Sequence, residues 1–79
     1  MLDGLIALRA FADTGTMARA ALRLRVTQSA VSKRIQSLED RLGRSLVEPI
    51  GRRVRLTTEG ERLLAEAEPL LHQLAEVLE

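Results

Sequence analysis

The residues best suited to chemistry in this chain are hydrogen-bonding side chains and cations grouped within ten positions. They are Thr27, Gln28, Ser29, Ser32, Lys33, Arg34 and Gln36. Glutamine can pair with adenine through two hydrogen bonds, hydroxyl groups suit phosphate, and cations suit phosphate or guanine. This set therefore indicates recognition of an anionic, hydrogen-bonding polymer rather than the breaking of covalent bonds.

A second cationic feature is the pair Arg52-Arg53, which lies between two short apolar segments. These segments are Leu46-Val47 and Val54-Leu56, and they predict a β-hairpin or a looser loop with the arginines at its tip. Such a tip suits the minor groove of a duplex or its phosphates. Pro49 restricts strand pairing in this region, and a solvated turn is the alternative interpretation.

Apolar periodicity predicts a helix over residues 28–42, and the polar and cationic residues between Thr27 and Gln36 lie at its start. One face of this helix carries Val31, Ile35, Leu38 and Leu42. This spacing is typical of a helix buried on one side. Thr27 is the expected N-cap and Gly43 the expected end. At about 100° per residue, the opposite face carries Ser29, Ser32, Lys33 and Gln36.

Two more helices precede this one. Residues 2–12 have amphipathic spacing, and Gly15 is suited to end that helix. Residues 17–24 form a short second helix with Thr16 as its N-cap. Its small residues Ala20 and Ala21 allow another helix to cross closely. Only Arg25-Val26 separates the second helix from Thr27, which is the spacing of a helix-turn-helix.

The last helix is expected to begin at Thr58, because Thr58 and Glu61 have capping-box spacing. Pro69 should bend this helix. The predicted fold is therefore mainly α: a winged helix-turn-helix, with three helices and a short β-hairpin wing, over residues 1–57. A long helix follows over residues 58–79.

The net charge of +1 hides a strong asymmetry along the chain. Residues 1–58 contain eleven Arg and Lys against five Asp and Glu, a balance of +6, whereas residues 59–79 contain one Arg against six Glu, a balance of −5. A basic body with an acidic end favours an anionic partner on one side of the molecule. Two solvated faces of opposite sign are the alternative explanation.

Composition argues against several other functions. The chain has no cysteine and only one histidine, His72, so it lacks the residues for a disulfide or a zinc site. Phe11 is its only aromatic residue, which disfavours stacking on unpaired bases. No apolar run reaches the roughly 20 residues of a membrane helix, and residues 1–4 lack the features of a signal peptide. We expect no membrane contact and a cytoplasmic location.

Taken together, these motifs resemble the N-terminal domain of LysR-type transcriptional regulators. The most specific part is the run Thr27–Ser32 followed by Ile35, Leu38-Glu39 and Leu42-Gly43. The same ungapped register includes Phe11, Gly15-Thr16, Ala20-Ala21, Leu24, Leu46, Arg52, Val54, Leu56-Thr57 and Gly60. Two positions depart from the family pattern. Val47 replaces a Phe, and Pro49 replaces an Arg, which removes a cation near the hairpin.

The resemblance implies binding to promoter DNA as a homodimer, or as a tetramer when full-length. The recognition helix would lie in the major groove, and the site would be an inverted repeat. The resemblance adds Thr16 as a phosphate contact. The candidate DNA-binding residues are thus Thr16, Thr27, Gln28, Ser29, Ser32, Lys33, Arg34, Gln36, Arg52 and Arg53.

The resemblance also implies that the long last helix pairs antiparallel with its copy in a second subunit. The expected dimer face is Leu63, Leu64, Ala67, Leu70, Leu71, Leu74 and Leu78. Of these, Leu64, Ala67, Leu71, Leu74 and Leu78 should be exposed on a single chain. Family members continue into an effector-binding domain, so we expect this chain to be a fragment that ends within the linker helix. No cofactor is expected in the fragment, and an unknown small-molecule effector would bind the missing domain.

Two other classes of function remain open at this point. A helical protein-interaction module with an incidental basic face predicts weak, salt-insensitive contact with DNA. An enzyme is disfavoured because the chain has no nucleophile paired with a base and no set of metal ligands. Taken individually, Thr27 can act only as a helix cap, and Gln28, Ser29 and Ser32 can be solvent-exposed surface residues without a binding role. Ordinary surface positions are also expected for Arg9, Arg19, Arg23, Arg44 and His72.

Overall fold

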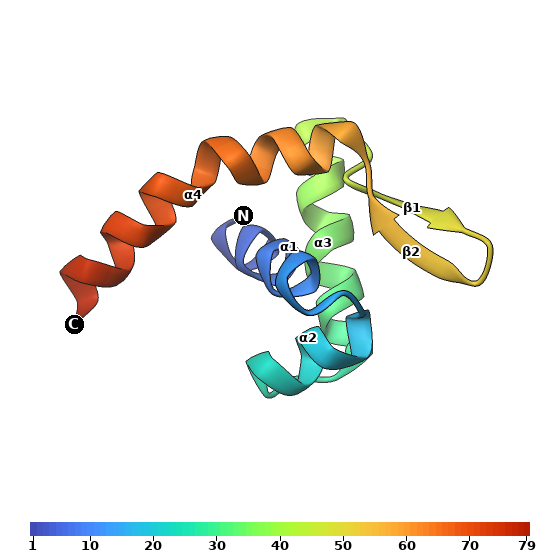
Figure 1. The fold of residues 1–79 in the computed structure, drawn as a ribbon, viewed down its shortest axis with the longest axis horizontal. Coiled ribbons are helices and arrows are strands. Elements are labelled where there is room, and N and C mark those ends of the chain that lie inside the picture. Colours follow the sequence, from blue (N-terminus) through green and yellow to red (C-terminus); the bar gives the residue numbers. More distant parts are fainter.

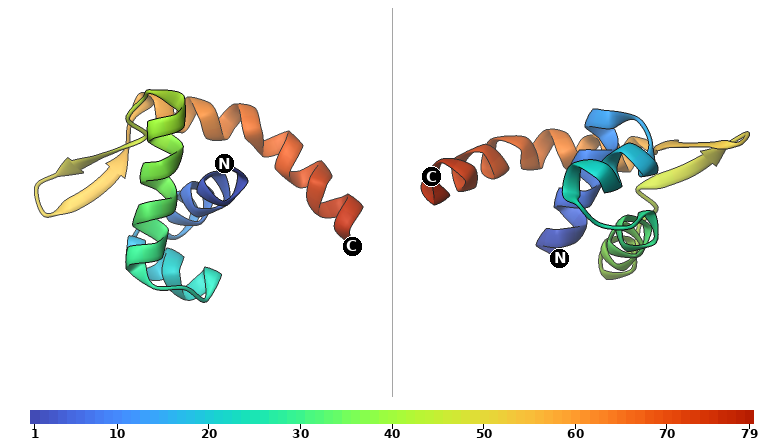
Figure 2. Two further views of the ribbon diagram at one scale, coloured as in Figure 1. Left: turned by 180° about the vertical axis from the view of Figure 1, so that it is seen from behind. Right: turned by 90° about the horizontal axis from the view of Figure 1, so that it is seen from below.

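The computed structural model describes residues 1–79, which form four helices and one β-hairpin (Figure 1). In chain order the elements are α1 (Leu2–Thr14), α2 (Met17–Leu24), α3 (Gln28–Leu42), β1 (Val47–Ile50), β2 (Arg53–Leu56) and α4 (Thr58–Leu78). The hairpin and α4 leave the same end of α3 in opposite directions (Figures 1 and 2). This confirms the predicted mainly helical, winged helix-turn-helix architecture. No helix has both the length and the apolar character that crossing a membrane requires.

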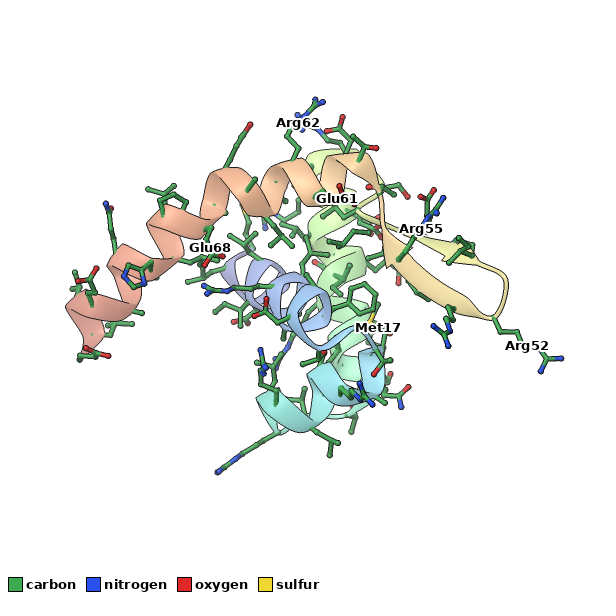
Figure 3. All side chains as sticks on the ribbon, in the orientation of Figure 1. Met17, Arg52, Arg55, Glu61, Arg62 and Glu68 are labelled. Atoms are coloured by element: carbon green, nitrogen blue, oxygen red, sulfur yellow. The ribbon has the colours of Figure 1, made fainter.

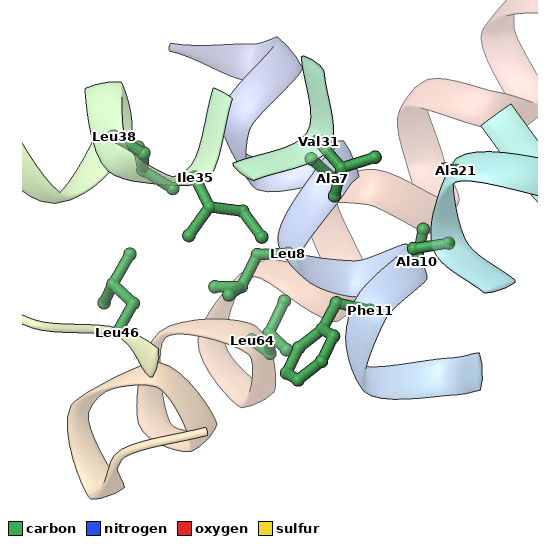
Figure 4. Close-up of a cluster of buried hydrophobic side chains, with 11 residues drawn as sticks. Ala7, Leu8, Ala10, Phe11, Ala21, Val31, Ile35, Leu38, Leu46 and Leu64 are labelled. Carbon is green, nitrogen blue, oxygen red and sulfur yellow. The ribbon is translucent and has the colours of Figure 1, made fainter. Parts of the chain in front are cut away.

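The core is apolar throughout and lies where α1, α2 and α3 meet the start of α4 (Figure 4). Its largest fully buried side chains are Leu8, Val31, Ile35 and Leu46, and no polar or charged residue is buried. The predicted inner face of α3 is confirmed at three positions, Val31, Ile35 and Leu38, while Leu42 is half-buried. Because this face holds α3 against the body, its opposite face is left to solvent.

Small residues allow the helices to approach one another. Ala20 and Ala21 of α2 are buried, as expected for a close crossing. The close contact at Gly4 of α1 was not predicted: a Cβ at Gly4 would lie 2.6 Å from the Arg34 carbonyl oxygen and 2.7 Å from the Leu38 Cβ. α1 and α3 therefore cross at a separation that only glycine permits.

Most predicted helix boundaries are confirmed. Gly15 and Gly43 adopt left-handed conformations, with φ of 88° and 66°, and end α1 and α3. α1 continues two residues beyond the predicted end at residue 12. These two residues are supported by Thr14, whose hydroxyl donates to the Ala10 carbonyl oxygen at 2.7 Å.

The predicted cap of α4 at Thr58 is wrong. Thr57 is the N-cap, and its hydroxyl oxygen accepts a hydrogen bond from the Gly60 N–H at 3.0 Å. Thr57 has the extended backbone of a cap residue, whereas Thr58 is already helical, so the expected pairing of Thr58 with Glu61 does not form. The Thr57 hydroxyl also donates to the Ser45 carbonyl oxygen at 2.7 Å, which ties the start of α4 to the base of the hairpin.

The hairpin is regular and longer than predicted. β1 and β2 pair antiparallel, with Val47 opposite Leu56 and Ile50 opposite Arg53, which leaves Gly51-Arg52 as a two-residue turn. Gly51 has a φ of 62°, as the first central residue of a type II′ turn requires. Pro49 pairs with Val54 inside the ladder. Both strands of a two-stranded ribbon are edge strands, and proline is tolerated there.

α4 lies across α1 in its first half, and its second half projects beyond the body and curves downward in Figure 1 (see also Figure 2). Pro69 lies inside the helix, which is consistent with the bend. The Arg9 guanidinium of α1 pairs with the Glu68 carboxylate at 2.8 Å and holds the two helices together. This position of α4 determines which of its apolar residues are free.

The expectation that Leu64 and Ala67 are exposed on a single chain is wrong, because both pack into the core of their own chain beside α1. Leu63 also packs against that core, and Leu71 is half-buried. The exposed apolar residues of α4 lie farther along the helix. They are Leu70, Leu74, Val77 and Leu78.

Candidate nucleic-acid interface

The first part of the candidate interface is the outer face of α3. Gln28, Ser29, Ser32, Lys33 and Gln36 are all exposed. None of these side chains is held by an intramolecular hydrogen bond or ion pair, since such contacts in the chain involve other residues. The first two and a half turns of α3 therefore present free donors and acceptors, as predicted from the apolar periodicity.

Arg34 is not part of this face. At about 100° per residue, it lies roughly 160° around the helix from Gln36. It is half-buried, and its carbonyl oxygen is the atom that Gly4 of α1 approaches. The structure thus groups Lys33 with the other candidate residues of α3 and separates Arg34 from them.

The threonines that precede α2 and α3 are the caps of these helices. The hydroxyl oxygen of Thr16 accepts from the Arg19 N–H, and that of Thr27 accepts from the Ala30 N–H, both at 3.0 Å. Each hydroxyl keeps its own hydrogen available for an outside acceptor. The first N–H groups of a helix have no partner within it, so the two starts are suited to phosphate.

A cleft of about 650 Å³ joins these helix starts to the hairpin. Its lining includes Thr16 and Arg19 from the start of α2, Gln28 from the start of α3, and Arg52 and Arg53 from the turn of the hairpin. Four predicted site residues from three separate parts of the sequence therefore meet around one depression. In Figure 3, Arg52 extends from the hairpin tip away from the body, and Met17 lies between α2 and the hairpin.

A second groove runs between α3 and the hairpin. Ser32, Gln36 and Glu39 line it on the α3 side, and Val47, Pro49 and Val54 are among its residues on the hairpin side. Thus the exposed polar face of α3 and the hairpin form the two walls of one concave surface. Such a shape can hold the edge of a duplex between a helix and a wing.

The charges are distributed very unevenly over the molecule. Five cationic side chains are in ion pairs with carboxylates, namely Arg9, Arg23, Arg44, Arg55 and Arg62. Seven have no carboxylate partner: Arg19, Arg25, Lys33, Arg34, Arg41, Arg52 and Arg53. Moreover, no Asp or Glu occurs between Asp13 and Glu39 or between Glu48 and Glu59. The lining of the cleft is consequently cationic and contains no acidic residue.

Arg19 is a further candidate, although the sequence predicts an ordinary surface position for it, as for Arg9, Arg23 and Arg44. Those three arginines are held in ion pairs. Arg19 instead has no carboxylate partner and lines the cleft. Its position in the first turn of α2, three residues after the cap Thr16, was the available signal.

Comparison with known proteins identifies the family. The model of bacterial regulatory helix-turn-helix proteins of the lysR family matches residues 2–61. The chain belongs to this lysR family. A relative from Vibrio cholerae serotype O1, an uncharacterized HTH-type transcriptional regulator, is 40% identical over 74 residues, which are 94% of this chain and 26% of that protein.

Solved lysR-family structures have the same fold. A crystal structure of a CbnR DBD–DNA complex has a TM-score of 0.86 at 34% identity and covers 98% of this chain and 88% of that one. A BenM DBD complex with catB site 1 DNA has a TM-score of 0.89 at 31% identity, with coverage of 99% and 88%. The curated relatives are transcriptional regulators, and the chain spans about a quarter of the length of the Vibrio protein.

Proposed function

We propose that this chain binds duplex DNA sequence-specifically, as the DNA-binding domain of a LysR-type transcription regulator with no catalytic role. The observation that carries the proposal is the cleft between the starts of α2 and α3 and the turn of the hairpin, whose charged lining residues are Arg19, Arg52 and Arg53, with no carboxylate among them. The two related structures solved with DNA support it. We place the DNA-binding unit at residues 1–57 and the linker helix at residues 58–79.

In this proposal α3 enters the major groove with its N-terminal turns. Gln28, Ser29 and Ser32 face the base edges, where glutamine favours adenine and serine tolerates several bases. Lys33 and Gln36 contact bases or backbone farther along the groove. Thr16, Arg19 and Thr27 bind phosphates at the helix starts, which sets the register of the protein on the duplex.

The hairpin is the wing of the domain in this proposal. Arg52 is at the turn and Arg53 begins β2, so both reach beyond α3 toward the neighbouring minor groove or its phosphates. Pro49 and Val54 on the flank of the wing carry no charge. The two arginines therefore account for the whole cationic contribution of the wing, because Arg55 is paired with Glu48 at 3.1 Å.

We further propose that two copies associate through the second half of α4. Leu70, Leu74, Val77 and Leu78 are exposed there on a helix that projects from the body. Burying this stripe against a second copy is favourable at roughly 25 cal/mol per Å² of apolar surface. A two-fold pair would present two α3 helices to an inverted repeat, with half-sites about 34 Å apart or a multiple of that.

The proposal for the full-length regulator has three further parts. It would act in the bacterial cytoplasm, form homodimers or tetramers, and respond to a small molecule bound outside residues 1–79. The relatives are longer than this chain, which leaves room for an effector-binding domain.

The test of DNA binding is a salt titration with a matched pair of variants. Each phosphate contact contributes about 0.9 to the slope of log affinity against log salt. Replacing Arg52 and Arg53 by Ala should therefore lower the slope by about 1.8 per bound chain. Between about 50 and about 200 mM salt, the wild-type chain should lose roughly 12-fold more affinity than this variant.

The matched control replaces Arg44 and Arg62 by Ala. Both pair with Glu59, at 3.3 and 3.7 Å, and neither lines the cleft or the groove beside α3. The control removes the same charge and should leave the slope unchanged. Selection of bound sites from a random duplex library should then yield an inverted repeat. Weak binding without salt dependence would instead favour a protein-interaction module.

A further inference from the structure

Glu39 connects α3 to the wing through its carboxylate. One oxygen, Oε2, accepts hydrogen bonds from the Leu46 N–H at 2.7 Å and from the Val47 N–H at 3.3 Å. Val47 is the first residue of β1, so both bonds hold the base of the hairpin. They are the only hydrogen bonds between α3 and the wing.

The other contacts at the base of the wing fix it to different parts of the chain. The Thr57 N–H donates to the Leu46 carbonyl oxygen at 2.9 Å, and the Thr57 hydroxyl binds the Ser45 carbonyl oxygen. These bonds tie the hairpin to the start of α4. The Leu46 side chain is buried in the core, and Val47 and Leu56 pack against that core at the base of the two strands. Glu39 adds the hydrogen bonds that link this base directly to α3.

Because Glu39 contacts the base of the hairpin, a small rotation there displaces the tip at Arg52 by a larger distance. Ser32, Gln36 and Glu39 lie on successive turns along the groove between α3 and the wing, and Glu39 is the one that contacts the base of the hairpin. The tip at Arg52 is five residues beyond Val47, which is about 16 Å in an extended strand. A rotation of about 10° at the base thus moves the tip by roughly 3 Å, which is enough to break a hydrogen bond to phosphate.

We propose that Glu39 is a positioning residue for DNA recognition, which sets the angle between α3 and the wing so that both reach the duplex together. This inference rests on the proposed DNA binding. Glu39 itself would not touch DNA, and its role would pass through the Leu46 and Val47 amides to Arg52 and Arg53. A carboxylate suits this role because one charged oxygen can accept two N–H groups in strong hydrogen bonds.

The test is a double-mutant cycle on a random-sequence duplex long enough for two half-sites. Glu39→Ala should lower the salt slope toward that of the Arg52→Ala/Arg53→Ala variant, a drop of up to about 1.8. When Glu39→Ala is added to that double variant, it should change the affinity by less than about twofold, since its effect passes through the same arginines. Glu39→Gln keeps an oxygen acceptor and should restore most of the slope.

Asp40→Ala is the matched control. Asp40 is the next residue of α3, is exposed, and makes no hydrogen bond or ion pair. The Asp40→Ala substitution removes the same charge as Glu39→Ala without changing a contact to the wing. The slope of log affinity against log salt should therefore equal that of the wild type. The chain has no cysteine, which allows spin labels at Ser37→Cys of α3 and Ile50→Cys of the wing. The distance distribution between the labels should broaden with Glu39→Ala and keep its width with Asp40→Ala.

Three results would overturn the inference. They are additive effects of Glu39→Ala and the arginine variant, a slope that Glu39→Ala leaves unchanged, and an unchanged label distribution. The distance measurement needs no DNA. It therefore tests the orientation of the wing even if partial unfolding reduces the DNA affinity of Glu39→Ala. A failure of the proposed function is distinguishable, since the wild-type chain itself would then bind without a salt slope.

Discussion

Gly4→Ala tests the close crossing of α1 and α3 on which the orientation of the recognition helix depends. In an isolated helix this change is favourable, because alanine has a helix propensity about 1 kcal/mol better than glycine. In this chain the new Cβ would meet the Arg34 carbonyl oxygen at 2.6 Å and the Leu38 Cβ at 2.7 Å. Neither atom can rotate away, because one is backbone and the other is fixed to it.

The helices must therefore separate by several tenths of an ångström. Overpacking of this kind costs about 1 to 3 kcal/mol, and rigid neighbours favour the upper end of that range. After the gain in helix propensity, we expect a net loss of about 2 kcal/mol in the free energy of unfolding. For a domain of this size the Tm should fall by roughly 8 to 16 °C.

The assay is urea and thermal unfolding followed by far-ultraviolet circular dichroism. Ala12→Gly is the matched control, because Ala12 is exposed in the same helix and reports the propensity difference alone. It should cost about 1 kcal/mol. If Gly4→Ala is as stable as the wild type or more stable, the two helices do not cross as closely as described and the reasoning is refuted.

Three other predictions concern α4 and α3. Leu64→Ala should lower the free energy of unfolding, measured in urea, by about 2 to 4 kcal/mol, because Leu64 is buried. Leu70→Ala is the control on the exposed side of the same helix and should change this free energy by less than about 0.5 kcal/mol if the chain is monomeric. Leu74→Glu should shift the chain to monomer in analytical ultracentrifugation with unchanged helix content, and a persistent dimer would place the interface elsewhere. Gln28→Ala should relax the preference at one or two base pairs by about 1 to 3 kcal/mol each, whereas equal losses on selected and random duplexes would exclude base reading by Gln28.

Features set by local sequence were predictable. The periodic apolar residues of α3, the caps at Thr16 and Thr27, and the glycines that end α1 and α3 all depend on a few neighbouring residues. The exposed face with Ser32 and Gln36 followed from that periodicity alone. The family resemblance, which depends on the same residues, was confirmed by the comparisons.

Features set by contacts between distant segments were not predictable in the same way. The burial of Leu64 depends on where α4 crosses α1, and periodicity in α4 cannot tell a core partner from a second subunit. The same limit applies to Gly4, whose role depends on α3, and to Glu39, whose hydrogen-bond partners are seven and eight residues away in another element. Arg19 shows the limit for charge, since only the fold reveals which arginines are neutralised by a carboxylate.

The absence of any buried polar side chain has a consequence for how this fold achieves a unique arrangement. Buried hydrogen-bonding groups often specify register, because a shifted alternative leaves them unpaired. Here that role falls to steric exclusion by backbone atoms. A Cβ at position 4 would collide with the Arg34 carbonyl oxygen, and a Cβ at position 60 would collide with the Leu46 carbonyl oxygen, so only glycine fits at these two contacts. Apolar residues of similar volume should therefore be exchangeable in the core, while the two glycines define the one registry in which the helices can dock.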